Sequence, residues 1–393
     1  SARFWVLAET VTARTDVPPL DSSAMDGYAV RFADVAGAAA GDPVRLELIE
    51  DIPAGTVGTR PVGTGQASRI MTGAPLPRGA DTVVRVEYTR PAHPALGAQV
   101  ELLEPEALGA NVRRRGEDMA VGALVLGPGA RCGPAEIGAL AALSHAVVAV
   151  HRQPRVAILS TGDELVELGQ VPGKGQIVNS NSHSLAALAR SAGAVPTILP
   201  LVGDREDDIR AAVHEALSAD LVVSSGGVSV GEHDLVKAVL AELGAHSILW
   251  RVAMKPGKPL LFCTLQGKPY FGLPGNPVSS MVSFLQFVQP AIRKSAGVPE
   301  REWRLPEARA VLDAQVRNRG DRREYLRARL RLDAERLHAA PLRGQGSHML
   351  TSMMGANGLV LLAPGQHAAA GDPVPVQIFG PIGVCDAPAP GPG

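Results

Sequence analysis

Between Pro154 and about Gly297, the chain alternates short apolar runs with longer amphipathic stretches. The apolar runs have the length and the residue types of buried strands, whereas the stretches between them have the spacing of helices. This alternation predicts a parallel, doubly wound α/β sheet with helices on both faces. Ligands bind such sheets at the carboxyl ends of the strands. We predict strands over 156–159, 197–202, 221–223 and 248–252, and helices over 185–190, 206–217 and 234–243.

The sequence before this region is typical of a small β module. From about residue 41 to 110 it is rich in Gly and Pro, with alternating apolar and polar runs at 44–48 and 82–88. Pro134 then begins a predicted helix that continues to Leu143, because proline suits the first helical turn.

The sequence after about residue 300 returns to the β pattern. In residues 326–332, apolar residues at even positions alternate with arginines at odd positions. We therefore predict a strand with one buried face and one basic face, the latter carrying Arg327, Arg329 and Arg331. The composition of residues 385–393 predicts a disordered tail.

Composition excludes several classes of protein. The 393 residues allow about two to four domains. The net charge is −1 and the basic residues are scattered, so we expect neither a nucleic-acid partner nor a membrane surface. The three cysteines, at positions 132, 263 and 385, are far apart, which argues against a disulfide framework or zinc ribbon. With no signal peptide and no apolar stretch of about 18 residues, we expect a soluble cytoplasmic protein.

Residues 221–234, LVVSSGGVSVGEHD, place a burst of small residues directly after a predicted buried strand. Gly226 and Gly227 allow the backbone to turn sharply and to approach a ligand closely. The free N–H groups at the start of the next predicted helix favour an anion. The segment is therefore a cradle for a phosphorylated ligand, a plain turn, or the nucleophile elbow of a serine hydrolase, since Gly227–Gly231 fits G-x-S-x-G. The elbow is the weakest reading, because the later Asp and His that it needs lie outside the predicted sheet.

Two rigid turns follow. Lys255 and Lys258 are two of only six lysines in a chain with 32 arginines, and they stand close to Arg251. Lysine in this setting suggests compact ammonium groups directed at phosphate or oxyanion oxygens, with a solvated basic turn as the alternative. In Gly272–Pro277, an Asn-Pro pair predicts a helix start with Asn276 as N-cap. That start is either purely structural or offers N–H groups to an anion.

Acidic residues follow three of the predicted strands: Asp163 with Glu164, then Asp204, then Asp234. Like charges about 4 Å apart repel by roughly 4 kcal/mol at an effective dielectric of about 20, so a shared crevice needs a cation or shared protons. Mg²⁺, which takes one or two carboxylates plus phosphate oxygens and waters, fits this set. Zinc does not, because the sequence has no Cys/His cluster at metal-ligand spacing. The alternative is that these acids are ordinary helix caps.

In chain order, these segments resemble one family closely, the molybdopterin molybdenumtransferases, which include MoeA and the gephyrin E domain. The matching motifs occur in the family's order and span most of the chain. They are PPLDSSAMDGYAV at 18–30, RIMTGA at 69–74, RGED at 115–118, STGDEL at 160–165, SGGVSVGEHD at 225–234, KPGK at 255–258 and GLPGNP at 272–277.

The resemblance implies an elongated homodimer of four-domain chains, with a central α/β domain similar to the molybdopterin adenylyltransferases, which could themselves be partners. The implied reaction combines adenylylated molybdopterin with molybdate, assisted by Mg²⁺, and yields molybdenum cofactor and AMP. The implied boundaries are 1–25 with 115–152 for a partly helical domain lacking the family's N-terminal helix, 26–114 for the β module, 153–300 for the α/β domain and 301–384 for a C-terminal β domain.

The resemblance also implies roles for individual residues. The acids implied for catalysis are Asp26, Asp118, Glu164, Asp204 and Asp234, and Glu164 and Asp234 are also implied for the metal. Implied substrate-binding residues are Thr72, Ser225, Gly226, Gly227, Ser229, Arg251, Lys255, Lys258, Pro274, Asn276 and Pro277. Arg327 and Ser347 are implied for molybdate.

Three details qualify this picture. In the family, the positions of Asp26 and Thr72 reach across to the α/β domain of the partner subunit. Arg251 stands where the family often has lysine, which keeps the charge but not the geometry. Two other functions fit the same segments: a molybdopterin adenylyltransferase that consumes ATP, against which the extra domains argue, and a scaffold without catalysis.

Overall fold

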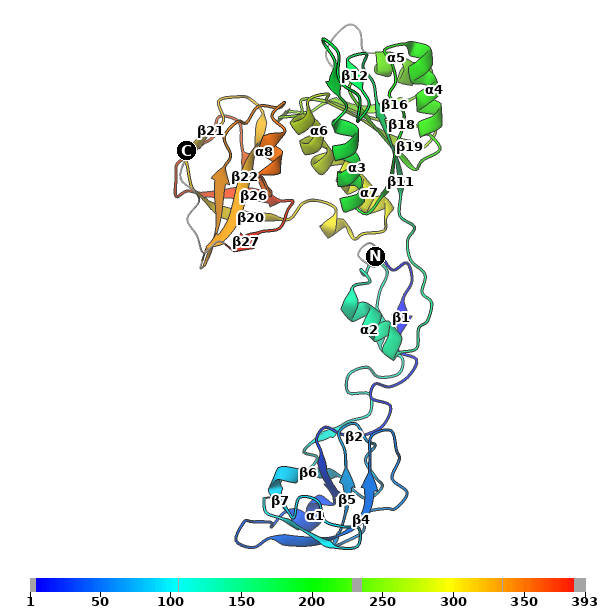
Figure 1. Cartoon of the computed structure of the whole chain (residues 1–393), viewed down its shortest axis with the longest axis vertical. Coiled ribbons are helices and arrows are strands. Elements are labelled where there is room, and N and C mark those ends of the chain that lie inside the picture. Colours follow the sequence, from blue (N-terminus) through cyan, green and yellow to red (C-terminus); the bar gives the residue numbers. More distant parts are fainter. Residues whose placement is uncertain (1–4, 105, 228–234, 334, 385–393) are drawn as a thin grey trace. The chain divides into compact units, whose positions relative to one another are not determined.

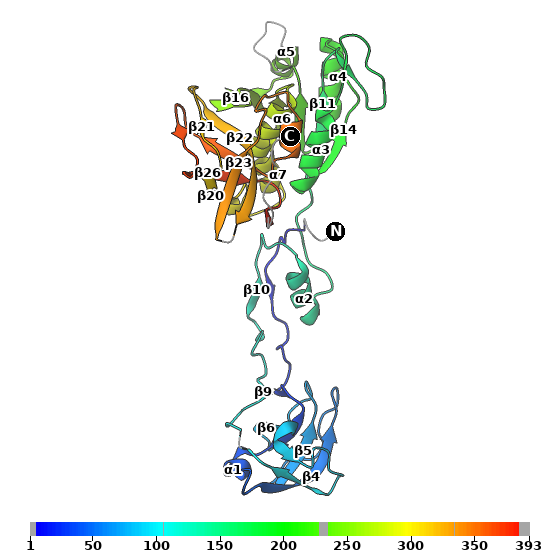
Figure 2. The same cartoon turned by 60° about the vertical axis from the view of Figure 1, so that its left-hand side comes forward.

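The computed structural model describes residues 5–104, 106–227, 235–333 and 335–384. The chain forms two compact units (Figures 1 and 2). One unit comprises residues 7–149. The other comprises residues 150 onward, together with Trp5 and Val6. Within the described residues, no helix is both long and apolar enough to cross a lipid bilayer.

The second unit contains a six-stranded sheet in the order β14-β11-β15-β19-β18-β16. Neighbouring strands are parallel except where β18 pairs with β19 and β16. The prediction of a wholly parallel sheet is therefore wrong at one strand. Gln266 and Gly267 both have positive φ and form a two-residue turn that reverses the chain between β18 and β19. The strands are β11 (Arg155–Ser160), β14 (Val195–Ile198), β15 (Leu221–Ser225), β16 (His246–Arg251), β18 (Pro259–Leu265) and β19 (Lys268–Leu273).

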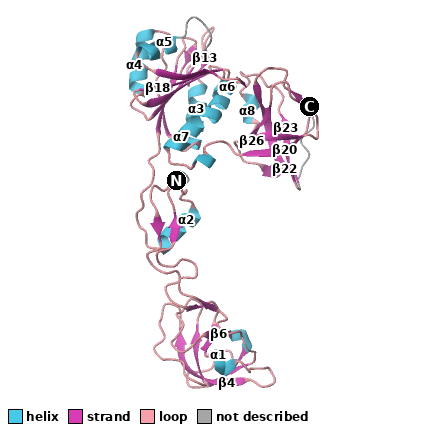
Figure 3. Ribbon diagram, turned by 180° about the vertical axis from the view of Figure 1, so that it is seen from behind, coloured by secondary structure: helices cyan, strands magenta, loops and turns pink. Residues whose placement is uncertain are grey.

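Helices cover both faces of this sheet, as predicted (Figure 3). Alternate strand residues serve the two faces: Leu159 packs in the core under α4 and α5, whereas Ile158 packs in the core under α3 and α7. All the predicted helices of the domain are present, although the strand predicted over 197–202 ends at Ile198. The helices are α3 (Asn181–Ser191), α4 (Glu206–Ala216), α5 (Leu235–Glu242), α6 (Pro277–Ser283), the π-helix Phe284–Val288 and α7 (Gln289–Ser295).

The C-terminal part of the same unit is a β domain. Six strands of its seven-stranded sheet have the order β17-β22-β23-β20-β26-β24, and β27 pairs with β22. Because β24 also pairs with β22, the five strands β22, β23, β20, β26 and β24 close into a ring. The short strand β17 belongs to the Lys-Pro-Gly-Lys segment, and this pairing joins the α/β and β domains. The strands are β17 (Met254–Lys255), β20 (Glu307–Leu312), β22 (Arg323–Asp333), β23 (Arg336–Pro341), β24 (Gly358–Leu362), β26 (Pro373–Ile378) and β27 (Gly383–Val384). A short helix, α8 (Thr351–Met354), precedes β24.

Strand β22 corrects the predicted alternation at both ends of the pattern. Arg327 is only 1% exposed rather than outward-facing, and Leu332 is 43% exposed rather than buried. Arg327 is covered because the loop before α8 folds over it, and the side chain of Gln345 bonds to its backbone N–H and carbonyl. Leu332 lies beyond the β22–β24 pairing, which runs only from Glu324 to Ala328.

The unit of residues 7–149 holds the predicted β module and helix. Its sheet has the order β6-β3-β5-β4-β8-β7 over a core that includes Tyr28 and Leu46. The run 82–88 is a strand only as far as Arg85, after which Val86–Tyr88 forms a 3₁₀ turn. The main elements are β3 (Gly27–Val30), α1 (Phe32–Val35), β4 (Val44–Ile52), β5 (Gln66–Ile70), β6 (Thr82–Arg85), β7 (Thr89–Arg90), β8 (Gln99–Leu102) and α2 (Pro134–Ala142). Short two-stranded pairings join β1 (Val11–Thr12) to β10 (Leu124–Leu126) and β2 (Ser22–Ser23) to β9 (Val112–Arg113).

Candidate active site

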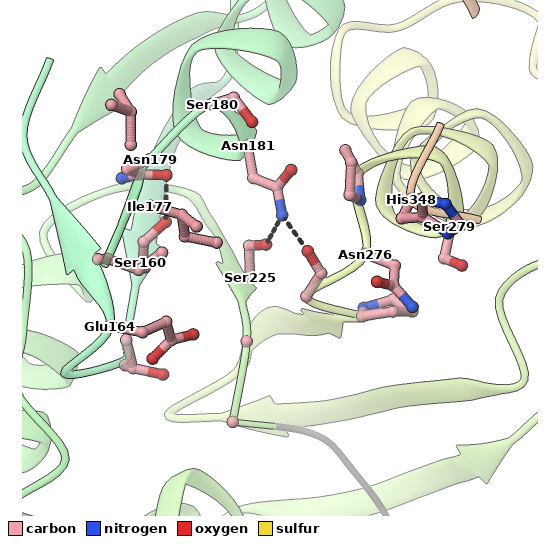
Figure 4. Close-up of a pocket in the computed structure, with 18 of the residues that line it drawn as sticks. Ser160, Glu164, Ile177, Asn179, Ser180, Asn181, Ser225, Asn276, Ser279 and His348 are labelled. Atoms are coloured by element: carbon pink, nitrogen blue, oxygen red, sulfur yellow. Dashed lines mark hydrogen bonds between the residues drawn. The ribbon is translucent and has the colours of Figure 1, made fainter. Parts of the chain in front are cut away.

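A cavity of about 700 Å³ lies at the carboxyl ends of β11, β15 and β19, where the topology predicts a binding site. Figure 4 shows Glu164 on one side of it and Asn276, Ser279 and His348 on the other. His348 comes from the β domain, so both domains of this unit line the cavity. Seven predicted site residues are brought together here: Glu164, Ser225, Gly226, Gly227, Pro274, Asn276 and Pro277.

The glycine loop after β15 has the backbone that the sequence predicts. Gly226 and Gly227 have φ values of +91° and +65°, a region that favours glycine. A Cβ at Gly226 would lie 2.7 Å from the carbonyl oxygen of Thr161, and one at Gly227 would lie 2.5 Å from Val236. Both positions therefore require glycine for steric as well as conformational reasons. Ser229 and Asp234 lie outside the described residues.

The loop is fastened by Asn181, a residue that the sequence analysis missed. Its side-chain amide donates to Ser225 Oγ at 2.8 Å and to the carbonyl oxygen of Gly275 at 2.7 Å (Figure 4). The first residue of α3 thus holds the end of β15 against the Gly-Asn turn. Behind it, Ser160 and Ser182 are hydrogen-bonded at 2.7 Å in a buried polar cluster. The polar run at 179–182 before an amphipathic helix was the available signal for these residues.

Two of the predicted acids lie at a second, smaller cavity of about 360 Å³, lined by Glu164 and Asp204. Gly162 has no Cβ, and a Cβ there would lie 2.4 Å from a carboxylate oxygen of Glu164. Asp163 instead accepts a hydrogen bond from the backbone N–H of Asp204 at 3.0 Å, which is a structural role. Among the described residues, no group of three His, Cys, Asp or Glu side chains could hold a metal ion.

The turn before α6 has the predicted N-cap residue but not the predicted cap. Asn276 occupies the N-cap position, yet its side chain makes no capping hydrogen bond. It donates instead to Ser347 Oγ at 3.1 Å, and the Val278 N–H donates to the carbonyl oxygen of Ser347 at 3.0 Å. These bonds hold the loop that carries Ser347 and His348 at the edge of the cavity.

The basic residues of the second predicted stretch lie elsewhere. Lys255 is on β17, and its ammonium pairs with Glu324 of β22 at 2.8 Å. Lys258 is exposed after this strand, and Arg251 is exposed at the end of β16. None of the three lines either cavity. The structure therefore brings the glycine loop and Glu164 together, but places Lys255 at the junction with the β domain.

Arg327 is a buried cation with only neutral partners. Its Nε donates to Ser352 Oγ at 3.2 Å, and its Nη2 donates to the carbonyl oxygen of Gly346 at 3.3 Å. No carboxylate in the described part of the chain lies within 4.0 Å of the guanidinium. Burial lowers the pKa of Arg327, and the charge of Glu324 offsets part of that change. Arg327 thus contacts the residue next to Ser347, so the two residues predicted for molybdate lie close to each other in the structure.

Three predicted residues belong to the unit of residues 7–149. Asp26 accepts hydrogen bonds from the backbone N–H of Thr72 at 2.7 Å and from Thr72 Oγ1 at 2.8 Å. These bonds lower the pKa of Asp26, the backbone bond having the largest effect. Asp118 is exposed, and its backbone N–H donates to the carbonyl oxygen of Val17. Asp26 and Thr72 therefore contact each other within this unit, which the sequence did not predict.

Three family models match consecutive parts of the chain. They are the MoeA N-terminal region (domains I and II) over residues 1–144, a probable molybdopterin binding domain over 157–294, and the MoeA C-terminal region (domain IV) over 309–379. A molybdopterin molybdenumtransferase from Nostoc is 42% identical over 331 residues, which is 83% of this chain and 75% of the relative. The chain belongs to the molybdopterin molybdenumtransferase family.

Other members of this family agree over nearly the whole length. A molybdopterin molybdenumtransferase 2 from Mycobacterium tuberculosis is 39% identical, covering 91% of this chain and 88% of the relative. The crystal structure of a molybdopterin biosynthesis MoeA protein from Pyrococcus horikoshii OT3 superposes with a TM-score of 0.82 at 28% identity, covering 96% and 93%. Most of the cavity lies in the segment that matches the molybdopterin binding domain, whereas Arg327, Ser347 and His348 lie in the segment that matches domain IV.

Proposed function

We propose that this chain inserts molybdenum into adenylylated molybdopterin, using molybdate and releasing AMP. The observation that carries the proposal is the convergence of the glycine loop, Glu164 and the Asn276 turn on one cavity of about 700 Å³. This size is within the range of pockets that enclose a drug-sized or nucleotide-sized ligand. Relatives that carry this activity in their names share 34–42% identity with the chain.

The reaction cleaves a phosphoanhydride, and the residues suit that chemistry. The backbone of Gly226 and Gly227 is proposed to approach the phosphates closely, because neither residue has a side chain that would keep a ligand away. The side chain of Glu164 has no hydrogen-bond or ion-pair partner in the described structure, so its carboxylate is proposed to orient the attacking oxygen. Positioning two anions against each other supplies much of the rate enhancement.

We propose Mg²⁺ as the cofactor, held by Glu164 and Asp234, with Asp204 nearby. With one or two carboxylates as protein ligands, the ion is proposed to share its coordination with substrate phosphates and waters. This arrangement is the one that Mg²⁺ commonly adopts in proteins. When bound, the ion offsets the negative charge that develops on the leaving AMP.

Arg327 and Ser347 are proposed to hold molybdate. Arg327 is 1% exposed, and its guanidinium has two neutral acceptors and no carboxylate within 4.0 Å in the described structure, so an oxyanion would give it a contacting counter-charge. Lys255, Lys258 and Arg251 are proposed to attract the anionic substrates from the junction of the two domains.

We further propose a cytoplasmic homodimer, in which Asp26 and Asp118 of the partner subunit complete each site. Cys132 and Cys263 are free and buried, as expected in a reducing compartment.

Mixing an Asp26→Asn variant with a Glu164→Gln variant tests the shared site, because mixed dimers contain one intact site. Recovery to about a quarter of the wild-type rate supports this arrangement, whereas no recovery contradicts it. A molybdopterin adenylyltransferase is the expected source of the substrate and a possible partner.

The test of the proposed function is AMP release from adenylylated molybdopterin with and without molybdate. Wild-type protein should release AMP in a molybdate-dependent manner, and Asp234→Asn should not match its rate. Consumption of ATP with molybdopterin would instead indicate an adenylyltransferase, and no turnover of either substrate would indicate a scaffold.

A further inference from the structure

We infer that the hydroxyl of Thr161 donates a hydrogen bond to a phosphate of the substrate at the point where the substrate passes between two cavities. The inference rests on the proposed function and extends it, because it assigns a residue and a place to the phosphate. Thr161 is not among the residues predicted from the sequence.

The two cavities share one wall. Thr161, Glu164, Gly226 and Gly227 line both the cavity of about 700 Å³ and the cavity of about 360 Å³. The larger cavity continues toward Asn276 and His348, whereas the smaller continues toward Asp204. On this inference, the substrate spans both cavities and its phosphate lies at the shared wall.

The Thr161 hydroxyl is buried without a partner. The residue is 3% exposed, and its Oγ1 makes no hydrogen bond in the described structure. A buried hydroxyl without a partner is unfavourable, and such groups are uncommon in folded proteins. A ligand oxygen that accepts from this hydroxyl removes the penalty, so the orphaned donor indicates where an acceptor binds.

The backbone holds this donor in place. The Thr161 N–H donates to the carbonyl oxygen of Ser225 at 3.4 Å, and Thr161 bridges to Val202 on its other side. Residue 227 leaves room next to this hydroxyl because it is glycine: a Cβ there would lie 3.0 Å from Thr161 Oγ1. The same missing side chain thus serves both the sharp turn and access to the hydroxyl.

The surrounding charges explain why a hydroxyl is useful at this position. Glu164 lies in the same shared wall, and Asp204 lines the smaller cavity, so a phosphate here faces carboxylates that repel it. The hydroxyl of Thr161 donates a hydrogen bond to the phosphate, while the cation proposed for Glu164 offsets the repulsion between phosphate and carboxylates.

The test compares Thr161→Val, which keeps the shape but removes the hydroxyl, with Thr161→Ser, which keeps the hydroxyl. Calorimetry on the full chain with Mg²⁺ should measure binding of AMP and of adenosine, which lacks the phosphate. We expect Thr161→Val to raise the Kd of AMP about tenfold, as for the loss of one charge-assisted hydrogen bond. Thr161→Ser should raise it less than about threefold, and neither variant should change adenosine binding.

A purely structural role would give a different result. Because the hydroxyl has no partner among the described residues, Thr161→Val should melt at the wild-type temperature or above it when no ligand is present. The inference is overturned if Thr161→Val binds AMP as tightly as wild type, or if it loses AMP and adenosine binding equally. It also fails if Thr161→Val melts well below wild type while Thr161→Ser does not.

The same variants separate this inference from the proposed function. If Thr161→Val releases AMP from adenylylated molybdopterin with wild-type KM, the inference fails and the function stands. If wild type releases no AMP but its AMP binding depends on the Thr161 hydroxyl, the function fails and the inference stands.

Discussion

Glu164 and Arg327 are two charged residues of the second unit with contrasting settings. Neither has a partner of opposite charge within 4.0 Å in the described structure. Glu164 is exposed in an open cavity, where water solvates its charge, whereas Arg327 is 1% exposed and touches only neutral groups. The solvated carboxylate of Glu164 carries little desolvation penalty, whereas the buried guanidinium of Arg327 carries a large one until an anion binds beside it. We therefore propose that Glu164 acts in the chemistry and that Arg327 acts in binding.

The largest expected effect follows removal of the Glu164 charge. Glu164→Gln should lower the rate of AMP release by about 100-fold, as for loss of a group that acts in proton transfer or orientation. Its thermal melting should not change, because the side chain has no partner to lose. The matched control is Glu215→Gln, an exposed acid on α4 that lines neither cavity, which should keep the wild-type rate. Equal loss in both variants would remove the special role of Glu164.

The next effect concerns the glycine loop after β15, which lines the cavity together with Glu164. Gly226→Ala should destabilise the unit by about 2 kcal/mol, because an L residue pays for positive φ and its Cβ meets a backbone oxygen. Gly275→Ala is the matched control, since φ is ordinary there and the nearest atom lies 4.0 Å away. Chemical denaturation measures both. Similar stability for the two variants would contradict the described loop.

Removing the buried charge of Arg327 should not destabilise the protein, in contrast to Gly226→Ala. Without molybdate, Arg327→Met should leave the free energy of unfolding unchanged or raise it by about 1–2 kcal/mol, as for other buried charges replaced by apolar residues. In wild type, saturating molybdate at about 100 times its Kd should add about 2.7 kcal/mol, and this gain should vanish in the variant.

The control for Arg327 is Arg329→Met, because Arg329 lies on the same strand but is exposed. This variant should keep the molybdate effect. A loss of more than about 3 kcal/mol in Arg327→Met without molybdate would show that Arg327 is a structural residue, and the comparison with Glu164 would fail.

The smallest effect contrasts Glu164 with an acid that does have partners. Two hydrogen bonds from Thr72 lower the pKa of Asp26 below its ordinary value of 3.8. Asp26 therefore contributes stability above pH 3.8, and this contribution is lost as the pH falls from there through the folded-state pKa. Thr72→Val keeps the backbone donor but removes the hydroxyl, so the pKa of Asp26 should rise part of the way toward 3.8.

Carbon-detected NMR titration of the Asp26 carboxyl measures this shift directly. Thr72→Ser keeps the hydroxyl and should keep the wild-type pKa. At pH 7 the stability should change by less than about 0.5 kcal/mol, because the pair is exposed. A pKa in Thr72→Val that equals the wild-type value would show that the hydroxyl does not act on Asp26.

The sequence predicted those features that depend on local rules. Small residues after a buried strand predicted the loop of Gly226 and Gly227, and the position after β11 predicted that Glu164 lies at the strand ends. Arg327 was mispredicted because alternation describes which face a residue lies on, not whether a loop distant in the sequence covers that face. The β18–β19 hairpin was missed because a Gln-Gly turn is a weak signal.

Other features depend on contacts that no local pattern encodes. Asn181 bonds to a residue 44 positions away and to another 94 positions away. Asn276 was correctly predicted at a helix start, but its side chain bonds Ser347 in another domain rather than its own helix. The orphaned hydroxyl of Thr161 follows from packing, since burial and the absence of a partner are properties of the folded chain.

The most direct test of the account is a crystal structure of the full chain with AMP, Mg²⁺ and molybdate. We predict that the AMP phosphate lies beside Gly226 and Gly227, within hydrogen-bond distance of Thr161 Oγ1 and on the side of Glu164. AMP bound on a surface that includes none of these residues would contradict the central claim that the strand ends of the α/β domain form the site.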